Sequence, residues 1–287
     1  MNFEKGRSLP QKRGCLQAVG SGTLAAMNKQ DYLSRFFKAD GRTVILPIDH
    51  GTAIPVPGLE SPAELIEKVK PFVDGYVANF GAALACAKQL EGKGICLRTD
   101  VYKPPFGENT DHGSFLTFSI DDALETDAHA VMNMLYPHHP NEAQMFRECA
   151  ELISESQQTG IPVILESLPF GIGRPDEYTV ENIRFAVRAA AELGADVVKT
   201  SYPGDRDAFE AIVKECYVPV VVLGGAASKD AGILKMVADA ISGGASGVAI
   251  GRNVWQHAQP ERMAKAIHAI VHENATADAA LGILEEG

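Results

Sequence analysis

Eight short runs of apolar, mostly β-branched residues recur along this chain, and amphipathic segments with a helical period separate them. Strands that are apolar throughout are typical of parallel sheets whose two faces are both covered by helices. Eight strand–helix units are the number that closes a barrel. The pattern therefore predicts an α/β protein with the (β/α)8, or TIM-barrel, fold. The runs are residues 44–49, 75–80, 95–100, 130–136, 162–167, 196–201, 219–224 and 247–251.

A doubly wound open sheet is the alternative arrangement of the same elements. The sequence disfavours it, because no G-x-G-x-x-G motif follows the first run and no second domain is evident. The boundaries of one helix are well marked: Thr179, with Glu181 in the first turn behind it, predicts a helix start, and Gly194 predicts the end of that helix.

Two parts of unequal size are expected. Residues 1–40 form an N-terminal extension, in which the segment MNKQDYLSRFF predicts a short amphipathic helix with Tyr32, Leu33, Phe36 and Phe37 on one side. Residues 41–287 form the catalytic barrel, and the chain length of 287 suits one such domain, for which about 250 residues is typical.

Composition excludes several classes of partner. The formal net charge of -11 argues against nucleic acid, whose phosphates require a basic surface. No apolar stretch is long enough to span a membrane, and the basic N-terminus has no apolar run behind it, as a secretory signal would. Five scattered cysteines, without a C-x-x-C pair, indicate neither disulfides nor a thiolate metal site and favour a reducing cytoplasm.

Polar residues at the carboxyl ends of the predicted strands are the ones that bear on function, because (β/α)8 enzymes place their chemistry there. Lys199 stands out among them, since it follows Asp-Val-Val in an apolar run. Burial disfavours the ammonium ion and frees the nucleophilic amine that imine formation requires. The alternative is a structural lysine that pairs with a carboxylate such as Glu166 or Asp49. The strand-end set is Asp49, Arg98, Asp100, Tyr136, Glu166, Lys199, Gly224, Gly225, Gly251 and Arg252.

Asp49 and Tyr136 each have two interpretations. Asp49 could orient the amine or bind a substrate hydroxyl, or it could serve the turn that Asp-His-Gly favours. Tyr136 could transfer protons, because a cationic iminium nearby makes a phenol easier to ionise, or it could be an aromatic residue of the barrel rim.

The loops after the seventh and eighth runs predict a phosphate site. Gly224 and Gly225 follow one run, and Gly251 with Arg252 follow the other. Glycines let backbone N–H groups approach an anion, and these two loops are the usual phosphate grip of the fold. Each loop alone could be only a tight turn; together they favour phosphate. Trp255 is expected to pack against the barrel.

The histidines do not indicate a metal site. His138 and His139 are adjacent, an arrangement that rarely converges on one ion, and the H-x3-H pair His268 and His272 lies in the last helical segment. Loop and helix histidines are therefore the expectation for these positions.

These motifs resemble those of the archaeal-type class I fructose-bisphosphate aldolase family, the branch that also contains 2-amino-3,7-dideoxy-heptulosonate synthase and the thiolase acting on phosphorylated autoinducer-2. The resemblance runs from about residue 41 to the C-terminus. It rests on VILPIDHG, LYP, ELGADVVKTSYPGD, PVVVLGG, GASGVAIGRNVWQ and AIVHENATADAAL.

The resemblance implies a Schiff-base lysine at Lys199, an orienting carboxylate at Asp49 and a proton-transferring phenol at Tyr136. Gly224, Gly225, Gly251 and Arg252 would hold the phosphate. Family members are metal-independent and usually homo-oligomeric, so no cofactor other than the covalent imine is expected, and the partner would be a small phosphorylated ketose or ketone.

Departures from the family pattern bear on the substrate. His138 and His139 follow Tyr-Pro, where the aldolases tend to have Gly-Ser, and Lys103 or Arg98 could hold a second anionic group. The leading expectation is cleavage or formation of a C–C bond in a fructose-bisphosphate or dihydroxyacetone-phosphate type of substrate. An acyl- or aldol-transferase of the same family and a non-catalytic phosphosugar-binding barrel are the alternatives.

Overall fold

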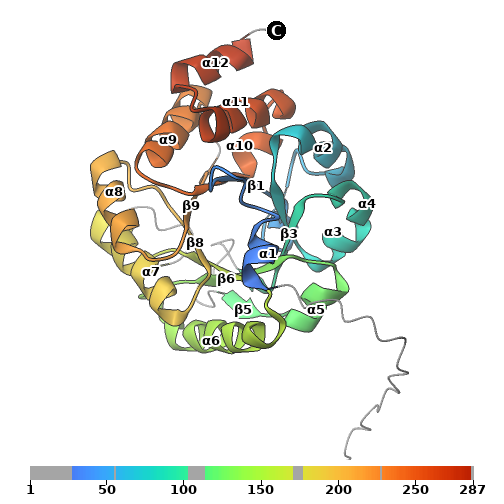
Figure 1. The fold of residues 1–287 in the computed structure, drawn as a ribbon, viewed down its shortest axis with the longest axis vertical. Helices are drawn as coiled ribbons and strands as arrows, with labels where there is room; N and C mark the ends of the chain where they lie inside the picture. Colours follow the sequence, from blue (N-terminus) through green and yellow to red (C-terminus); the bar gives the residue numbers. More distant parts are fainter. Residues whose placement is uncertain (1–27, 55, 103–113, 171–176, 227, 286–287) are drawn as a thin grey trace, which may run out of the picture.

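The computed structural model describes residues 28–54, 56–102, 114–170, 177–226 and 228–285. Eight parallel strands close into a barrel in the order β1-β10-β9-β8-β7-β6-β3-β2, which confirms the predicted (β/α)8 fold (Figure 1). Each predicted run supplies one strand. The strands are β1 Thr43–Pro47, β2 Gly75–Ala78, β3 Gly94–Arg98, β6 Ala130–Leu135, β7 Val163–Ser167, β8 Val197–Thr200, β9 Val220–Leu223 and β10 Gly247–Ala249.

Helices surround the barrel as an outer ring (Figure 1). The longer helices between strands, such as α6, α7 and α9, bury one apolar face against the barrel, as amphipathic segments between parallel strands must. A small antiparallel hairpin, β4 Asp100–Tyr102 with β5 Ser114–Leu116, lies after β3. The helices are α1 Lys29–Leu33, η1 His50–Thr52, α2 Pro62–Val69, η2 Lys70–Phe72, α3 Phe80–Ala85, α4 Ala87–Leu90, α5 Ile120–Glu125, α6 Glu142–Thr159, α7 Val180–Leu193, α8 Arg206–Glu215, α9 Asp230–Ser242, α10 Arg252–Trp255, α11 Pro260–Glu273 and α12 Ala277–Glu285.

The boundaries predicted for α7 are confirmed. The Thr179 side chain accepts a hydrogen bond from the backbone N–H of Asn182, so it satisfies one donor of the first turn. Gly194 ends the helix in the left-handed conformation, with φ at 113°, which a residue without Cβ adopts at little cost. The caps set the two ends of α7, and its buried residues Ile183, Ala186, Val187, Ala190 and Ala191 set which face is turned toward the barrel.

The barrel interior is apolar at the amino-terminal ends of the strands, here called its lower end, and the ring of Phe36 closes the barrel there. Phe36, in the turn after α1, is fully buried and packs with the inward-facing side chains of the strands. A Cβ at Gly75 or at Gly94 would overlap the Phe36 ring, so these two glycines make the space for it. The apolar layer that Phe36 joins consists of Ile45, Val77, Cys96, Ala130, Met132, Ile164, Val197, Val221 and Ala249.

Helix α1 is tied to this lower end by an ion pair. Lys29 Nζ lies 2.8 Å from a carboxylate oxygen of Asp196, which directly precedes β8, and α1 overlies the ring of strands in Figure 1. Residues 1–27, the larger part of the predicted extension, lie outside the described residues. The division of the chain at residue 40 therefore stays a prediction.

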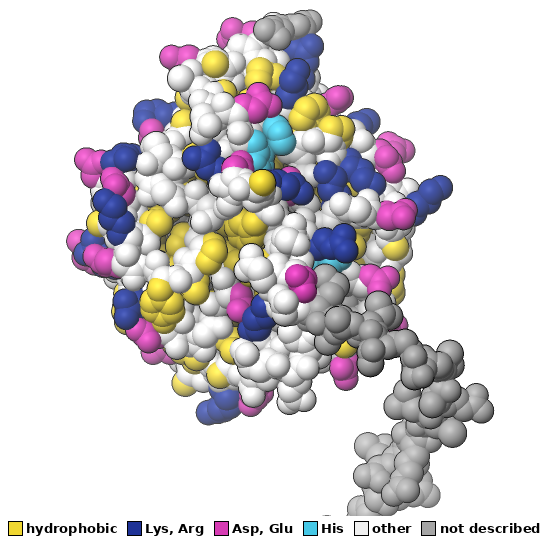
Figure 2. Space-filling view, in the orientation of Figure 1, with side chains coloured by type: hydrophobic (Ala, Val, Ile, Leu, Met, Phe, Trp, Pro, Cys, Tyr) yellow, Lys and Arg dark blue, Asp and Glu magenta, His cyan; other side chains and the backbone are white. Residues whose placement is uncertain are grey.

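The surface carries both signs of charge. Figure 2 shows acidic and basic side chains interspersed around the visible face rather than gathered into one basic stripe. Within the described ranges, no helix combines the length and the apolar character that crossing a membrane requires.

Replacing Phe36 with Ala is expected to lower the free energy of unfolding by about 3–5 kcal/mol, because it leaves a cavity beneath the apolar layer. Urea denaturation followed by circular dichroism measures the change. Phe37→Ala is the matched control, since Phe37 is only partly buried, and its loss should be clearly smaller. Equal losses for the two variants would contradict the role given to Phe36.

Candidate active site

A layer of charged residues lies directly above the apolar layer, at the carboxyl ends of the strands. Inward-facing side chains recur every second residue along a strand. Arg98 follows Cys96 at this spacing, Glu166 follows Ile164, and Lys199 follows Val197, each pair within one strand. The alternation that builds the core therefore also points these three charged side chains into the mouth of the barrel.

Lys199 is buried and paired with a carboxylate. Its Nζ lies 2.9 Å from Glu166 Oε1, and the lysine is 4% exposed. Glu166 and Lys199 are directly opposite each other in the register of β7 and β8, so the contact is set by the backbone pairing. The sulfur of Met132, which belongs to the apolar layer, lies 3.9 Å from the amine. The structure thus realises the pairing that the sequence left as the alternative to imine chemistry, and the two are compatible.

Arg98 connects the carboxylates of this layer. Its Nη2 lies 2.8 Å from Glu166 Oε2, and its Nε lies 3.3 Å from Asp49 Oδ2 and 3.2 Å from Asp100 Oδ1. The guanidinium is 1% exposed. Because three carboxylates surround it, Arg98 is poorly placed to bind an anionic group of a substrate. The geometry favours a positioning role over the substrate contact expected from the sequence. Lys103, the other residue expected to make that contact, lies outside the described residues.

The carboxylates of the layer differ in acidity. Burial would raise the pKa of Asp49, yet Arg98, His50 and Lys199 together hold it well below the ordinary value. Burial also opposes ionisation of Glu166, but Lys199 and Arg98 outweigh it and lower its pKa. For Asp100, burial prevails over Arg98 and over the hydrogen bond from Ser114, so its pKa is raised. Asp49 and Glu166 are therefore the ionised members that face the two cations.

Tyr136 presents a buried hydroxyl toward the same layer. The residue is 1% exposed, and its Oη has no hydrogen-bond partner among the described residues. Burial, with the charges of Asp100 and Glu166 nearby, raises the pKa of the phenol well above its ordinary value. The unliganded site therefore holds Tyr136 as a neutral phenol with a proton to donate. A buried polar group without a partner costs about 1–3 kcal/mol, which a substrate oxygen could recover.

The four predicted phosphate residues lie at the same end of the barrel, after β9 and β10. Gly225 has φ at 64°, a conformation that a side chain would strain. At Gly251 a Cβ would crowd the carbonyl of Pro47 and the rings of Trp255 and His50. Arg252 is half-buried, and its Nε has no hydrogen-bond partner in the described part of the chain.

The side chain of Asn253 joins these two loops. Its Nδ2 donates to the carbonyls of Gly224, at 2.9 Å, and Ala226, at 3.2 Å. Its Oδ1 accepts from the backbone N–H of Ser228 at 2.9 Å and from the Ser228 hydroxyl at 3.2 Å. In a trans peptide the C=O and the following N–H point in opposite directions. The N–H of Gly225 therefore points away from Asn253, where an anion could accept from it.

Trp255 packs as expected and ties the last loop to the first strand. It is 2% exposed, and its indole N–H donates to the carbonyl of Pro47 at 3.2 Å. The ring of His50 meets it edge-on, with centroids 5.4 Å apart. The loop with Arg252 is thus held against the end of β1, where Asp49 lies.

The histidines lie in separate parts of the molecule, except for the adjacent His138 and His139 and for His268 and His272 on α11, whose ring centroids are 4.7 Å apart. His138 stacks on Phe185 of α7, and His139 lies beside Tyr136. His272, on α11, is in contact with Asp40 and Asp74, and Asp74 directly precedes β2 at the opposite end of the barrel. No group of three or more His, Cys, Asp or Glu side chains suited to a metal ion occurs within the residues that the structure describes.

Sequence reasoning named Asp49, Tyr136 and Lys199 as catalytic, and the structure brings all three to one layer. It left Glu166 as a pairing partner of the lysine and did not single out Asn253. The signal for Glu166 was its place at a strand end, two residues beyond an inward-facing Ile164. For Asn253 the only signal was its position after Arg252, because its partners lie 25 to 29 residues earlier in the chain.

The sequence is similar to one family of known proteins along most of its length. Residues 43–257 match the model of the DeoC/LacD family aldolases. The 2-amino-3,7-dideoxy-D-threo-hept-6-ulosonate synthase 1 of Archaeoglobus fulgidus is 34% identical, over 86% of this chain and 92% of its own length.

Two solved structures share the fold along nearly their whole length. The crystal structure of an archaeal fructose 1,6-bisphosphate aldolase has a TM-score of 0.77 and 28% identity, covering 86% of this chain and 100% of that one. An archaeal fructose-1,6-bisphosphate aldolase with its catalytic Lys covalently bound to the carbinolamine intermediate of the substrate has a TM-score of 0.76 and 28% identity, covering 85% and 99%.

Replacing Arg98 with Met is expected to destabilise the fold by about 3–5 kcal/mol at pH 7, because it leaves buried carboxylates without their cation. In the parent protein, Asp49 and Glu166 have lowered pKa values, so their contribution is present above the pKa of the unfolded chain and is lost as pH falls through the folded values. In the variant, only Lys199 and His50 still oppose the effect of burial, so the pKa values of Asp49 and Glu166 rise and protonation relieves part of the lost stability as pH falls. The difference in the free energy of unfolding between the parent protein and the variant should therefore become smaller as the pH is lowered from 7 to 5.

Urea denaturation at the two pH values measures this difference. Arg184→Met is the matched control, because Arg184 is a partly exposed arginine with one ion pair on the outer surface, and its effect should be small at both. If the Arg98 variant loses the same free energy of unfolding at pH 7 and at pH 5, the electrostatic account is contradicted.

Proposed function

This chain belongs to the DeoC/LacD family of aldolases, and we propose that Lys199 is its imine-forming residue, acting on the ketone of a small phosphorylated ketose. It is a class I aldolase, an enzyme that works through a covalent lysine Schiff base and needs no metal ion. The observation that carries the assignment of Lys199 is its 2.9 Å contact with Glu166 in the buried layer at the strand ends.

Glu166 gives Lys199 a route for its protons. The carboxylate takes one proton from the ammonium, and the neutral amine then adds its lone pair to the ketone carbon. Glu166 passes protons to the former ketone oxygen, which leaves as water. Of the three ammonium protons, two depart in that water and one stays on the iminium nitrogen, so Glu166 ends as the carboxylate it began as. Arg98, bonded to the other oxygen of Glu166 at 2.8 Å, holds the carboxylate in place.

The iminium acts as an electron sink for the adjacent carbon–carbon bond. When that bond breaks, its electrons form an enamine, the hydroxyl on the departing carbon gives its proton to the ionised Asp49, and the rest of the sugar leaves as an aldehyde. The proton taken up by Asp49 replaces the one that the enamine carbon receives, so no net proton is gained or lost, and the reverse reaction joins the two parts. Tyr136 is the donor for the enamine carbon in the cleavage direction, because its phenol is held protonated. In the synthetic direction the same oxygen takes the proton back, aided by the positive iminium. Asp49, ionised beside Arg98, orients a substrate hydroxyl.

The loops that contain Gly224, Gly225, Gly251 and Arg252 support a phosphorylated substrate. They lie after β9 and β10, where barrels of this kind commonly bind phosphate, and Arg252 offers a half-buried guanidinium. A bound phosphate fixes the ketone relative to Lys199, which contributes to the rate through positioning.

A ketose such as fructose-1,6-bisphosphate, with dihydroxyacetone phosphate as the donor half, is the substrate we put first. The archaeal fructose-bisphosphate aldolase structures favour it. The heptulosonate synthase relative, at 34% identity, favours a transfer reaction at the same lysine as the second candidate. We extend two further expectations to this chain: assembly into a homo-oligomer and residence in a reducing cytoplasm.

Borohydride reduction in the presence of dihydroxyacetone phosphate should link the ketone irreversibly to Lys199, and peptide mass mapping should locate the adduct there. Lys199→Ala should abolish both the adduct and turnover while leaving the far-UV circular dichroism spectrum unchanged. Tyr136→Phe should retain the adduct but slow turnover by about 10²–10⁴-fold, because it loses only proton transfer.

Lys214→Ala is the matched control, since Lys214 is an exposed lysine on α8, and it should behave as the parent protein does. Trapping that persists in the Lys199 variant would refute the assignment of the lysine. An adduct that forms with a phosphorylated diketone but not with dihydroxyacetone phosphate would keep Lys199 and exchange the first substrate for the transferase alternative.

Asn253→Ala should raise KM for the phosphorylated substrate by up to about 100-fold, because it frees the loop that presents the phosphate-binding backbone. Borohydride trapping of unphosphorylated dihydroxyacetone on Lys199 should stay at the parent level. Asn253→Asp keeps the acceptor for Ser228 but loses the two N–H donors, so an intermediate KM is expected. If trapping of unphosphorylated dihydroxyacetone weakens as much as binding of the phosphorylated substrate, Asn253 supports the barrel in general rather than the phosphate loops.

A further inference from the structure

The outward face of α7 carries a short, regular pattern of charge and aromatic residues. Glu181, Phe185, Arg188 and Glu192 are all exposed, and the spacing of four, three and four residues places them on one face of the helix. Phe185 is 46% exposed even though it stacks on His138. Single exposed hydrophobics are ordinary on protein surfaces; here the exposed ring lies between an acidic and a basic side chain.

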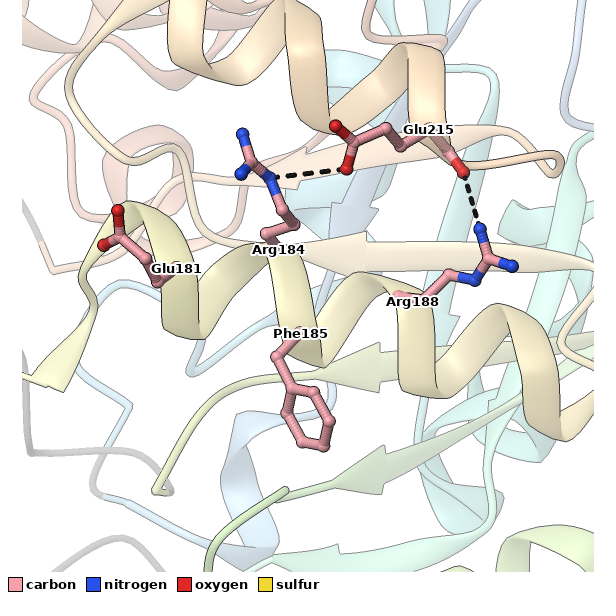
Figure 3. A pocket seen from close by; sticks show the side chains of 5 residues that line it. All are labelled: Glu181, Arg184, Phe185, Arg188 and Glu215. Carbon is pink, nitrogen blue, oxygen red and sulfur yellow. Dashed lines mark hydrogen bonds and ion pairs between the residues drawn. The ribbon is translucent and has the colours of Figure 1, made fainter.

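Beside this face a groove of about 470 Å³ runs between α7 and the end of α8, lined by Glu181, Arg184, Phe185, Arg188 and Glu215 (Figure 3). Figure 3 shows both arginines reaching toward Glu215, with Phe185 pointing to the other side of α7. Tyr217, 61% exposed, lies under the Arg188 guanidinium at 5.4 Å. Aromatic residues and arginine are the types that interfaces concentrate.

The pattern is complementary to itself. In a two-fold symmetric contact between antiparallel helices, positions equidistant from the centre meet. With the centre between Arg184 and Phe185, Glu181 of one copy meets Arg188 of the other, and the reverse pair forms on the far side. The two pairs lie about 10 Å apart along the helix, and the two Phe185 rings meet between them.

Arg188 retains donors for such a contact. Its Nε and Nη2 donate to Glu192 of the same chain, and its Nη1 donates to the carbonyl of Glu215. A guanidinium has five N–H groups, so two are left after these three bonds within the described part of the chain. Glu181 and Arg188 are two helical turns apart in one chain, too far to pair with each other.

We propose that α7 is a two-fold interface between two copies of this chain, with Phe185 at its centre and the Glu181–Arg188 pair formed twice between the copies. The parallel arrangement of the same helices would bring Glu181 against Glu181 and Arg188 against Arg188, so charge selects the antiparallel one. Whether larger assemblies form through other surfaces is independent of this contact.

Charge reversal tests the pairing. Sedimentation velocity across a concentration series should show that Arg188→Glu and Glu181→Arg each lose one association step, with the dissociation constant raised at least about tenfold, since like charges then face each other. Mixing the two variants should restore association at the parent affinity, because each copy then supplies the charge that the other lacks. The double variant, with both charges exchanged, should associate by itself.

Aldolase turnover at the parent rate in every variant shows that the fold is intact, because none of these residues belongs to the layer that contains Lys199. Lys235→Glu is the matched control, an exposed reversal on α9, and it should leave association unchanged. The proposal is overturned if the parent chain is monomeric at high concentration, if the single variants associate normally, or if neither the mixture nor the double variant recovers association.

Discussion

A guanidinium buried among three carboxylates is the interaction on which the mouth of this barrel depends. Arg98 contacts Asp49, Asp100 and Glu166 within 2.8–3.3 Å, and these residues come from three segments of the chain, after β1, at the junction of β3 and β4, and in β7. Without the cation, burial would favour protonated carboxyls. Lys199 and Arg98 together keep Glu166 ionised, and an ionised Glu166 is what can accept a proton from Lys199. The residue with the most contacts in the site thus acts on the chemistry through another residue.

The residues proposed to react with the ketone and those proposed to bind the phosphate lie on different elements of the barrel. The charged layer that contains Lys199 is built on inward-facing residues of β3, β7 and β8, whereas the residues proposed to bind phosphate lie on the loops after β9 and β10. Asn253 joins the two loops to each other through hydrogen bonds to the carbonyls of Gly224 and Ala226. Trp255 joins the second loop to β1 through a hydrogen bond to the carbonyl of Pro47. A substrate that engages both parts has its ketone placed by rigid elements at each end, which is the condition for a large contribution from positioning.

The barrel could be predicted from the sequence because apolar runs and helical segments alternate eight times. The rule about strand ends then gives ten candidate positions, and the resemblance to the aldolase family selects Lys199, Asp49 and Tyr136 among them. Arg98 was harder. An arginine at a strand end fits an anionic substrate as well as it fits buried carboxylates, and only the pairing of strands far apart in sequence decides between them. Asn253 depends on loop geometry that no local pattern encodes, and the outward charges of α7 acquire meaning only when the buried face of that helix is known.

The aromatic plug at the lower end of the barrel joins three positions that are far apart in the chain. The ring of Phe36 occupies the space that side chains at Gly75 and Gly94 would need. Enlarging either glycine requires a smaller residue at position 36, and shrinking Phe36 leaves a void that a larger residue at 75 or 94 could fill. Natural variants of this chain are thus expected to change these positions together, so that the lower end of the barrel evolves as a correlated triple while the strands around it drift independently.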